Sequence, residues 1–451
     1  MPHAHPIGIR RRELLQVGFS VFAGLGLGAG FAPRAVASEA KPKAKKSKQV
    51  LLVFLTGAAS HIDTFDPKPE APPEIRGEFA TIATSIPGIH FAEPLPGLAA
   101  RMDRLAVVRS FAHKDNNHTA ATHHLTTGTI QPGVFFDKPL SRDDWPVYAS
   151  GVSFCNPPGD GIPAGVTLPY FLQAGPLVWP GQHAGFLGPK HDPWQIDRDP
   201  NKTDFAVENV SLHGLEVTQL EDRLSLLASV NRQQAILAQS TDAKKLTDQQ
   251  AQAMALLTRG AVGKAFDLRS ESDRVRDRYG RHTFGQSLLL AKRLLEAGVP
   301  VVQANMGRVQ NWDSHSGNFK RLKNDLLPPL DRGVSALIDD LDASGLSDDV
   351  LVVVIGEFGR TPKVNKDDGG RDHWAACFSG LFFGAGVRGG QAIGQSDATG
   401  SYPKTVPYSP DDLGATIYRT LGIDPASELH DRTKRPVQLN RGTPIEALAT
   451  G

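Results

Sequence analysis

Long apolar runs that end at glycine or at a polar residue recur along the chain and predict the strands of a buried sheet. The first occupies residues 48–57, where KQVLLVFLTG is apolar over almost its whole length. Runs without polar alternation are typical of central strands in a parallel sheet, because both faces of such a strand are covered. The same pattern predicts four further strands, at residues 103–111, 298–306, 348–356 and 379–386.

Apolar residues at three- and four-residue spacing predict helices between these runs. The segments are residues 116–128, 214–234, 283–298, 318–345 and 409–423. The fourth contains a Pro-Pro interruption, and the last begins with Ser-Pro-Asp, a signal for a helix start. Strands that alternate with helices predict a doubly wound α/β fold, with a mostly parallel central sheet flanked by helices.

Residues 129–204 break this alternation and are dense in Pro, Gly, Trp and Phe. So long a stretch without a helix or strand pattern inside a compact domain is usually functional, as a lid or a pocket wall. Its aromatic content argues against disorder. We therefore predict one large domain over residues 49–445, in which residues 129–204 form an ordered excursion that covers one end of the sheet.

The first residues of the chain have the layout of an export signal. Arg11-Arg12 is followed by an apolar run at residues 17–31 and by the small-x-small sequence Ala35-Val36-Ala37. We interpret residues 1–37 as a cleaved signal of the twin-arginine type, which predicts export by that machinery to the periplasm or beyond. The apolar run is too short for a spanning helix, so no stable membrane span is expected after cleavage. Residues 38–48, which are rich in lysine, are predicted to be a solvated basic linker.

The net charge of the chain limits its possible binding partners, and its cysteine content limits its possible disulfides. The 49 Lys and Arg residues oppose 48 Asp and Glu residues and leave a formal net charge of +1. Neither nucleic acid nor an anionic membrane is therefore expected as a partner. Export implies an oxidising compartment, in which Cys155 and Cys377 either form one disulfide or remain two buried thiols.

Carboxylates, amides and histidines follow four of the predicted strands, at the edge where open α/β sheets bind their ligands. They are His61, Asp63 and Asp66; His113, Asp115, Asn116, Asn117 and His118; Asp313 and His315; and Glu357 with Asp372 and His373. Taken singly, such residues are most often helix caps, turn residues or surface residues. Their convergence on one sheet edge predicts a site for zinc, manganese or a similar divalent ion, because mixed oxygen and nitrogen donors suit such ions.

The helix predicted at residues 116–128 offers a place for an anion. Asn116 or Asn117 can cap this helix, with His118 and Thr119 in its first turn. The unpaired N–H groups and the positive dipole end of a helix start favour an anionic ester. Arg360, which follows the fourth strand closely, is placed to supply a bidentate contact to the same anion.

Six ordered motifs resemble a bacterial exported family, domain of unknown function 1501, which is distantly similar to the alkaline phosphatase and sulfatase superfamily. They are HIDTFDPKPEAPPEIRGEF, DNNHTAATHHLTTG, GQHAGFLGPKHDPW, WDSHSGNF, GEFGRTPKVN and GRDHW. The resemblance spans about residues 48–439 and implies the same α/β fold. It also implies one or two divalent ions, zinc, manganese or calcium, at the carboxyl edge of the sheet.

The resemblance also implies roles for individual residues. By position, the metal ligands are Asp63, Asp313, His315, Glu357 and His373, with Asp372 in reserve. The nucleophile falls at His118 or Thr119. Beyond what the resemblance implies, we predict Arg360 as a third catalytic residue, and Asn116, Asn117 and His183 as substrate-binding residues. The sulfatase signature Cys/Ser-x-Pro-x-Arg is missing from this sequence, and Asn117-His118 stands where the phosphatases have Asp-Ser. A formylglycine nucleophile is therefore not expected.

Two functions of different kinds follow from these motifs. The first is an exported metal-dependent hydrolase of phosphate or sulfate esters, including esters carried by polysaccharides, in which Thr119, His118 or metal-activated water attacks. The second is a catalytically degenerate member that binds glycan or a cell-envelope partner, with Trp145, Trp179 and Trp194 available to stack on sugars. A phosphomutase or lipid-headgroup transferase is a third alternative, because a fold does not fix the acceptor.

Overall fold

A computed structural model describes residues 48–449, apart from residues 134–136, 160, 207–260 and 367. The predicted signal, nearly all of the predicted linker and the helix expected at residues 214–234 lie outside the described part of the chain.

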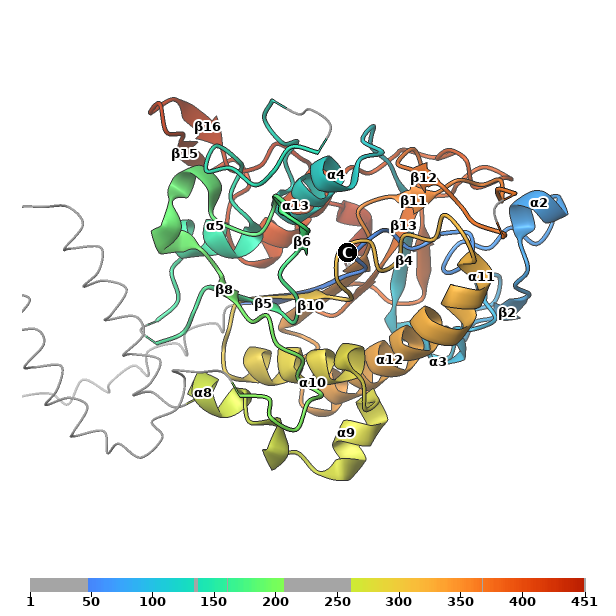
Figure 1. Cartoon of the computed structure of the whole chain (residues 1–451), viewed down its shortest axis with the longest axis horizontal. Coiled ribbons are helices and arrows are strands. Elements are labelled where there is room, and N and C mark those ends of the chain that lie inside the picture. The colour runs from blue at the N-terminus through green and yellow to red at the C-terminus, as the bar shows by residue number, and fades with distance from the viewer. Residues whose placement is uncertain (1–47, 134–136, 160, 207–260, 367, 450–451) are drawn as a thin grey trace, which may run out of the picture. The chain divides into compact units, whose positions relative to one another are not determined.

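An eight-stranded sheet forms the centre of the described domain (Figure 1). Its strand order is β14-β4-β13-β10-β1-β9-β5-β8. The strands are β1 Gln49–Phe54, β4 Ala106–Phe111, β5 Gly165–Leu168, β8 Trp194–Gln195, β9 Val301–Asn305, β10 Val350–Ile355, β13 Phe378–Phe383 and β14 Gln391–Ile393. Neighbours pair in parallel except at β13, which is antiparallel to both β10 and β4. The five strands predicted from apolar runs are present, and the mostly parallel α/β sheet is confirmed.

Helices cover both faces of the sheet (Figure 1). One layer contains α3 Pro96–Ala99, α8 Ala261–Ala265, α9 Asp273–Tyr279, α10 Thr283–Glu296 and α12 Leu327–Ala343, and the other contains α4 His118–Thr127, α5 Tyr148–Cys155 and α13 Pro410–Thr420. Alternate residues of β1 enter different hydrophobic clusters, Leu51 and Val53 on one face and Val50 and Leu52 on the other. Because both faces are buried, the strand sequences are apolar without alternation.

The helix ends follow the local sequence signals. Ser409 caps α13 and forms a reciprocal capping box with Asp412. Ahead of α12, the chain forms α11 Asn318–Arg321 and then a π-helical turn, η5 Leu322–Leu326. The Pro-Pro pair therefore falls in the first turn of α12, where a missing N–H costs little.

Residues 129–204 are more regular than the sequence predicts. They contribute α5 to one helical layer and β5 and β8 to one edge of the central sheet. The four residues of β5 lie between Pro163 and Pro169, and so short a run gives no strand pattern. Its burial comes from parallel pairing with β9, which is distant in sequence. The same stretch holds β6 Gln173–Ala174, β7 Leu177–Val178, η2 Gly185–Leu187 and η3 Pro189–His191.

Short elements complete the domain outside the main sheet and helical layers. They are α2 Pro73–Arg76, β2 Thr81–Ala83, β3 His90–Ala92, η1 Met102–Arg104, η4 Leu268–Ser270, β11 Gly359–Arg360, β12 His373–Trp374, β15 Glu428–His430, β16 Pro436–Gln438 and η6 Glu446–Leu448. Of these, β11 and β12 bear on the site, because their antiparallel pairing sets Arg360 opposite His373.

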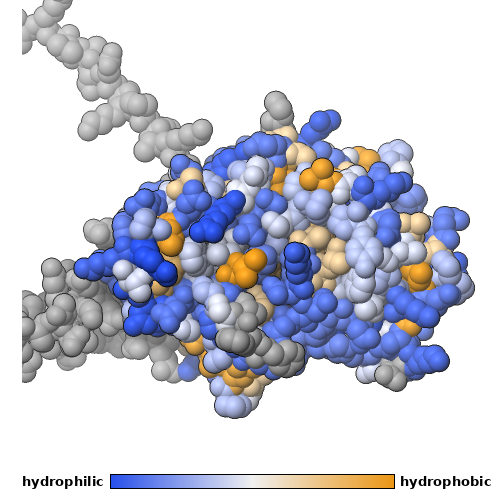
Figure 2. Space-filling view, turned by 90° about the horizontal axis from the view of Figure 1, so that it is seen from above, coloured by the Kyte–Doolittle hydropathy of each residue, from blue (hydrophilic) through white to orange (hydrophobic). Residues whose placement is uncertain are grey.

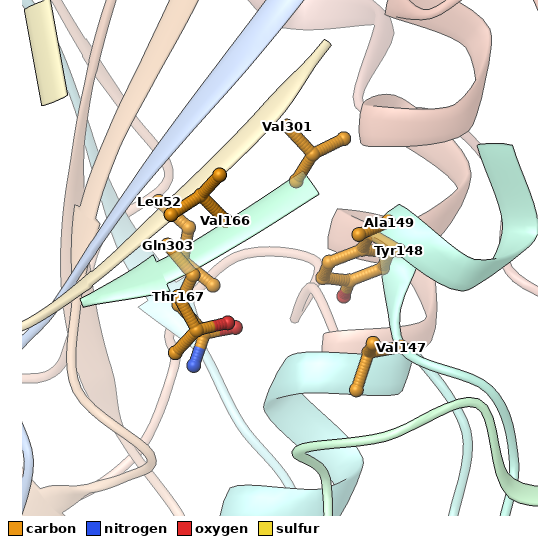
Figure 3. A pocket seen from close by; sticks show the side chains of 8 residues that line it. All are labelled: Leu52, Val147, Tyr148, Ala149, Val166, Thr167, Val301 and Gln303. Carbon is orange, nitrogen blue, oxygen red and sulfur yellow. The ribbon is translucent and has the colours of Figure 1, made fainter. Parts of the chain in front are cut away.

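A cavity of about 10 Å³ lies between the start of α5 and strands β1, β5 and β9. Figure 3 shows Tyr148 and Ala149 across it from Val166 and Val301. A space of this size holds one water molecule at most. We interpret it as a packing gap and not as a ligand site.

The surface, the cysteines and the helices can each be compared with the expectations from the sequence. The face seen in Figure 2 is largely hydrophilic, with hydrophobic residues in small separate patches. Cys155 is exposed and Cys377 is buried, and both are free thiols, so the structure has neither the expected disulfide nor the expected pair of buried thiols. Within the described residues, no helix combines the length and the apolar character needed to cross a membrane.

Candidate metal centre

Three histidines converge on the carboxylate of Asp313 at the carboxyl edge of the sheet. The Nε2 atoms of His315 and His373 lie 3.1 Å and 3.3 Å from Oδ1 of Asp313. Nε2 of His118 lies 3.3 Å from Oδ2 of the same carboxylate. The Nε2 atoms of His315 and His373 are 3.0 Å apart. The structure thus gathers side chains from the β9 loop, the start of α4 and β12.

A hydrogen-bond acceptor fixes the other nitrogen of each histidine. Nδ1 of His118 lies 2.7 Å from Oε1 of Glu357, and Nδ1 of His315 lies 2.6 Å from Oδ1 of Asp372. Nδ1 of His373 lies 2.7 Å from the carbonyl oxygen of Asn116. Each Nδ1 therefore donates, and each Nε2 keeps the lone pair that can bind a metal. Metal-binding histidines characteristically have such partners on the nitrogen that does not bind the metal.

The buried Nε2 atom of His118 tests whether these residues fit a divalent ion. Among the described residues it has no hydrogen-bond partner, since its approach to Asp313 lacks hydrogen-bonding geometry. Two electron-rich atoms in contact are unfavourable unless a proton or a metal ion lies between them. Zinc–nitrogen bonds of about 2.0–2.1 Å imply about 3.3 Å between donors in a tetrahedral site. The separations of 3.0–3.3 Å are close to that spacing, and one ligand atom each of His118, Asp313 and His373 lies within 4.8 Å of the others, so these residues fit such an ion with His315 beside them.

The electrostatics of the centre also favour positive charge between these side chains. Burial acts to raise the pKa of Asp313, but contacts with His118, His373 and Arg360 outweigh burial and hold that pKa well below its usual range. Burial acts to lower the pKa of His118, but Asp313 and Glu357 outweigh it and raise that pKa. His315, whose side chain is 47 % exposed, opens the centre to solvent.

The backbone conformation at Gly57 allows the segments that follow strands β1, β9 and β10 to approach one another closely. Gly57 follows β1 with a φ of +96°, and its N–H donates to both carboxylate oxygens of Glu357, at 2.9 Å and 3.1 Å. A Cβ at Gly57 would lie only 2.6 Å from Cα of Gln310 and 2.9 Å from the backbone nitrogen of Asp313. Glycine is therefore required for the close approach of the Asp313 loop.

Arg360 does not occupy the place expected of an anion clamp. Its side chain is completely buried, and Nη1 lies 2.5 Å from Oδ1 of Asp313. The remaining guanidinium donors bond to the carbonyl oxygens of Gly57, Ala58 and Arg371. These contacts bury the guanidinium against Oδ1 of Asp313, the oxygen that His315 and His373 also approach, and leave none of it exposed to a ligand.

Asp63 lies outside the group that converges on Asp313. Its oxygens accept from Nε and Nη2 of Arg371, at 2.7 Å and 3.0 Å, and one of them also accepts from Nδ2 of Asn318, at 2.8 Å. The structure thus engages Asp63 in a buried ion pair. Of the other expected ligands, Glu357 and Asp372 hold histidines, while Asp313, His315 and His373 converge. Sequence reasoning missed Arg371 and Asn318, although Arg371 lies inside the GRDHW motif.

The start of α4 is capped by Asn117, one of the two expected residues. Its Oδ1 accepts from the backbone N–H groups of Thr119 and Ala120 and, at 2.6 Å, from the hydroxyl of Thr119. Thr119 is 1 % exposed. The hydroxyl expected as a nucleophile is therefore buried and engaged. Asn116 instead supports the centre, because its backbone oxygen holds His373 and its side chain accepts from Ala375 N–H.

His183 is buried apart from the four converging side chains. Its Nδ1 accepts from the N–H of Gly185 at 3.0 Å, and burial lowers its pKa. The three tryptophans considered for sugar stacking mainly pack the protein interior. Trp179 is buried against His118, Trp145 donates to the carbonyl of Leu439, and Trp194 packs on a hydrophobic cluster.

Comparisons with known proteins place the chain in a family and describe similar folds. A family model described as "Protein of unknown function (DUF1501)" matches residues 47–449. Among solved structures, Ps i-CgsB in complex with k-i-k-neocarrahexaose is 12 % identical, with a TM-score of 0.42, over 89 % of this chain and 75 % of that chain. A sulfatase from Pseudoalteromonas sp. is 13 % identical, with a TM-score of 0.38, over 92 % of this chain and 72 % of that one.

A third solved structure, alkaline phosphatase from the Antarctic bacterium TAB5, is 13 % identical, with a TM-score of 0.34, over 84 % of this chain and 99 % of that chain. Similarities this low transfer no residue role and no activity. No curated protein matches the chain.

Proposed function

The chain belongs to the DUF1501 family of proteins of unknown function, and we propose that it is an exported, metal-dependent hydrolase of phosphate or sulfate esters. The observation that carries this proposal is the convergence of three Nε2 atoms on the carboxylate of Asp313. A site with nitrogen and oxygen donors, whose histidines are held by hydrogen bonds and which is open to solvent at His315, is suited to a divalent ion that meets substrate from solvent.

His118, Asp313 and His373 would hold this ion, with His315 beside them as a further donor. Imidazole nitrogens together with one carboxylate favour zinc over calcium, which takes six to eight oxygen ligands. When bound, such an ion polarises an ester oxygen and lowers the pKa of a water molecule. Glu357 and Asp372 orient His118 and His315, and Arg360 offsets the charge of Asp313.

Water is proposed as the attacking group. The hydroxyl of Thr119 is buried and donates to Asn117, and His118 faces Asp313, so neither is free to form a covalent adduct. In the hydrolysis, a bond forms between the water oxygen and phosphorus or sulfur, and the ester bond to the alcohol oxygen breaks. One proton of the water ends on the departing alcohol.

A pocket formed in part by the loop that carries Asp313 supports a saccharide ester as substrate. Its volume is about 390 Å³, its lining includes Arg308, Asn311 and Trp312, and neither Asp313 nor any of the three histidines that converge on it lines the pocket. The ring of Tyr170, which also lines the pocket, lies 5.0 Å from the guanidinium carbon of Arg308. A pocket that combines aromatic and hydrogen-bonding groups suits a sugar ring with its hydroxyls.

The experiment is a turnover assay on the purified full chain, loaded with zinc, against aryl phosphates and aryl sulfates. We expect hydrolysis that a chelator abolishes and added zinc restores. His373→Asn keeps a donor toward the Asn116 carbonyl but removes Nε2, and it should abolish turnover. Thr119→Val removes the hydroxyl and should leave turnover within a fewfold.

Two results would overturn parts of this proposal. A zinc-loaded chain that hydrolyses neither ester class contradicts the hydrolase and favours the degenerate, binding alternative. A chain in which Thr119→Val abolishes turnover, while zinc content is unchanged, contradicts direct attack by water and restores Thr119 as the nucleophile.

A further inference from the structure

A second group of ligand side chains includes a histidine that contacts the backbone oxygen of Glu357, and we propose that this group forms a separate divalent-metal site. It consists of His113, Asp115 and His124, and one ligand atom of each lies within 4.8 Å of the others. None of the three belongs to the group around Asp313. Two imidazoles and one carboxylate, with room for water, are a donor set that suits zinc or a similar ion.

Hydrogen bonds select which nitrogen of each histidine is free. Nε2 of His113 lies 2.7 Å from the carbonyl oxygen of Glu357, which can only accept, so this nitrogen carries the proton. Nε2 of His124 lies 2.6 Å from Oδ2 of Asp411 and donates in the same way. With Nε2 as the donor in each ring, Nδ1 is the nitrogen that can offer a lone pair to a metal.

The Nδ1 atom of His124 is the observation that points to a ligand. It is buried in a side chain that is 3 % exposed, and within the described structure it has no hydrogen-bond partner. A buried acceptor without a partner costs free energy, which an ion at this place would recover. Asp411 supplies the partner that metal-binding histidines have on their second nitrogen.

The backbone holds these side chains in place for an ion. The N–H of His113 donates to the carbonyl of Ala375 at 2.9 Å, and Ala112 N–H donates to the carbonyl of Tyr408 at 2.8 Å. His124 lies in the last turn of α4, with its ring centroid 5.5 Å from that of His113. Nδ1 of His113 accepts a 3.1 Å hydrogen bond from Asp115 N–H, and the ion would replace that bond.

An ion in the second site would stabilise the position of Glu357 and, through Glu357, that of His118 in the first site. His113 bonds to the backbone oxygen of Glu357, and the carboxylate of Glu357 holds His118. An ion on His113, Asp115 and His124 would thus fix the loop between β4 and α4 against the start of α13, which carries Asp411. The site is distinct in its ligands, so it can be present whether or not the chain hydrolyses esters.

The test is metal stoichiometry in the purified full chain, stripped by a chelator, exposed to excess zinc and measured by elemental analysis after gel filtration. His124→Gln places an amide nitrogen where Nε2 bonds Asp411 and removes only Nδ1. We expect this variant to bind one zinc ion fewer than the unaltered chain. His373→Asn should lose the other ion and keep this one. Asp411→Asn should weaken zinc binding at this site by about 10- to 100-fold.

Asp115→Asn provides an independent test on a partly exposed loop residue, should His124→Gln fail to fold. Circular dichroism melting of each variant reports folding. If His124→Gln and Asp115→Asn, both folded, bind as much zinc as the unaltered chain, the second site is refuted and the centre at Asp313 is untouched. If only His373→Asn retains its zinc content, the centre at Asp313 is refuted and the second site stands.

Discussion

The side chains of Glu357 and His118 are joined by a 2.7 Å contact between Oε1 and Nδ1, although 239 positions separate them in sequence. Glu357 is 0 % exposed and is held in turn by the N–H of Gly57. This arrangement turns Nε2 of His118 toward Asp313. Glu357 thereby orients the side chain of His118 in the candidate metal centre. This role differs from the ligand role that the family resemblance implies for Glu357.

Replacing Glu357 by Gln should weaken metal binding without removing a ligand. The amide keeps the size of the side chain but loses the charge that makes His118 a stronger donor, so zinc affinity should fall by about 10- to 100-fold. Competition with a chromophoric chelator measures this affinity. Asp372→Asn is the matched control, since Asp372 holds His315 in the same way but is 54 % exposed. Its effect should be smaller, and equal affinity in Glu357→Gln and the unaltered chain would contradict the role of Glu357.

Asp63→Asn distinguishes a structural residue from a metal ligand. The change leaves the completely buried guanidinium of Arg371 without its charged partner. Loss of one member of a buried ion pair typically costs about 3–5 kcal/mol of unfolding free energy. Denaturant unfolding should show a loss of this order, while the zinc affinity of the folded protein stays unchanged. Reduced zinc affinity at unchanged stability would instead restore Asp63 as a ligand.

The sequence predicts which segments form the long central strands better than it predicts which segments pair with one another. Strands β1, β4, β9, β10 and β13 are buried on both faces, so their apolar runs are long and easily recognised. Strand β5 has four residues and is buried only because it pairs with β9, a contact that no local pattern reveals.

The sequence predicts where the candidate site lies, but only in part which residue faces the ion and which one holds a histidine. Strand ends in a parallel sheet meet at one edge, so the convergence of Asp313, His315 and His373 follows from topology. Which carboxylate faces the ion and which holds a histidine depends on side-chain partners far away in sequence. Asp63 and Arg371, which are 308 positions apart, could not be paired from local spacing.

Gly57→Ala should disturb the centre through the backbone. A Cβ there would meet the Gln310 backbone at 2.6 Å, and the residue has a positive φ. Strain and displacement of the Asp313 loop should cost about 2–5 kcal/mol of stability and lower zinc affinity. Gly88→Ala is the control, because Gly88 has a φ of +84° but an added Cβ would have no neighbour within 4 Å. It should cost about 1–2 kcal/mol and leave zinc affinity unchanged. Equal zinc affinities in the two variants would contradict the close approach.

Acid should destabilise the protein partly through His61. Burial lowers the pKa of this histidine below 6.5, so the folded state takes up a proton less readily than the unfolded state. Its contribution to stability is complete above pH 6.5 and is lost as the pH falls from there toward the lowered pKa. His61→Gln keeps a donor toward the Gly400 carbonyl, which Nε2 of His61 bonds at 2.8 Å, but cannot titrate.

The measurement for His61 is unfolding free energy between pH 7 and pH 5. The variant should lose less stability over this range than the unaltered chain, and the surface change His430→Gln serves as control for the substitution. An identical pH dependence in His61→Gln and the unaltered chain would show that His61 does not titrate in this way.

Anomalous X-ray scattering at the zinc edge, from crystals of the zinc-loaded chain, tests the metal centre most directly. We predict a peak at bonding distance, about 2.0–2.2 Å, from Nε2 of His118, His315 and His373 and from a carboxylate oxygen of Asp313. A zinc-loaded crystal with no anomalous peak among these four side chains would contradict the centre, and with it the proposed metal-dependent hydrolase.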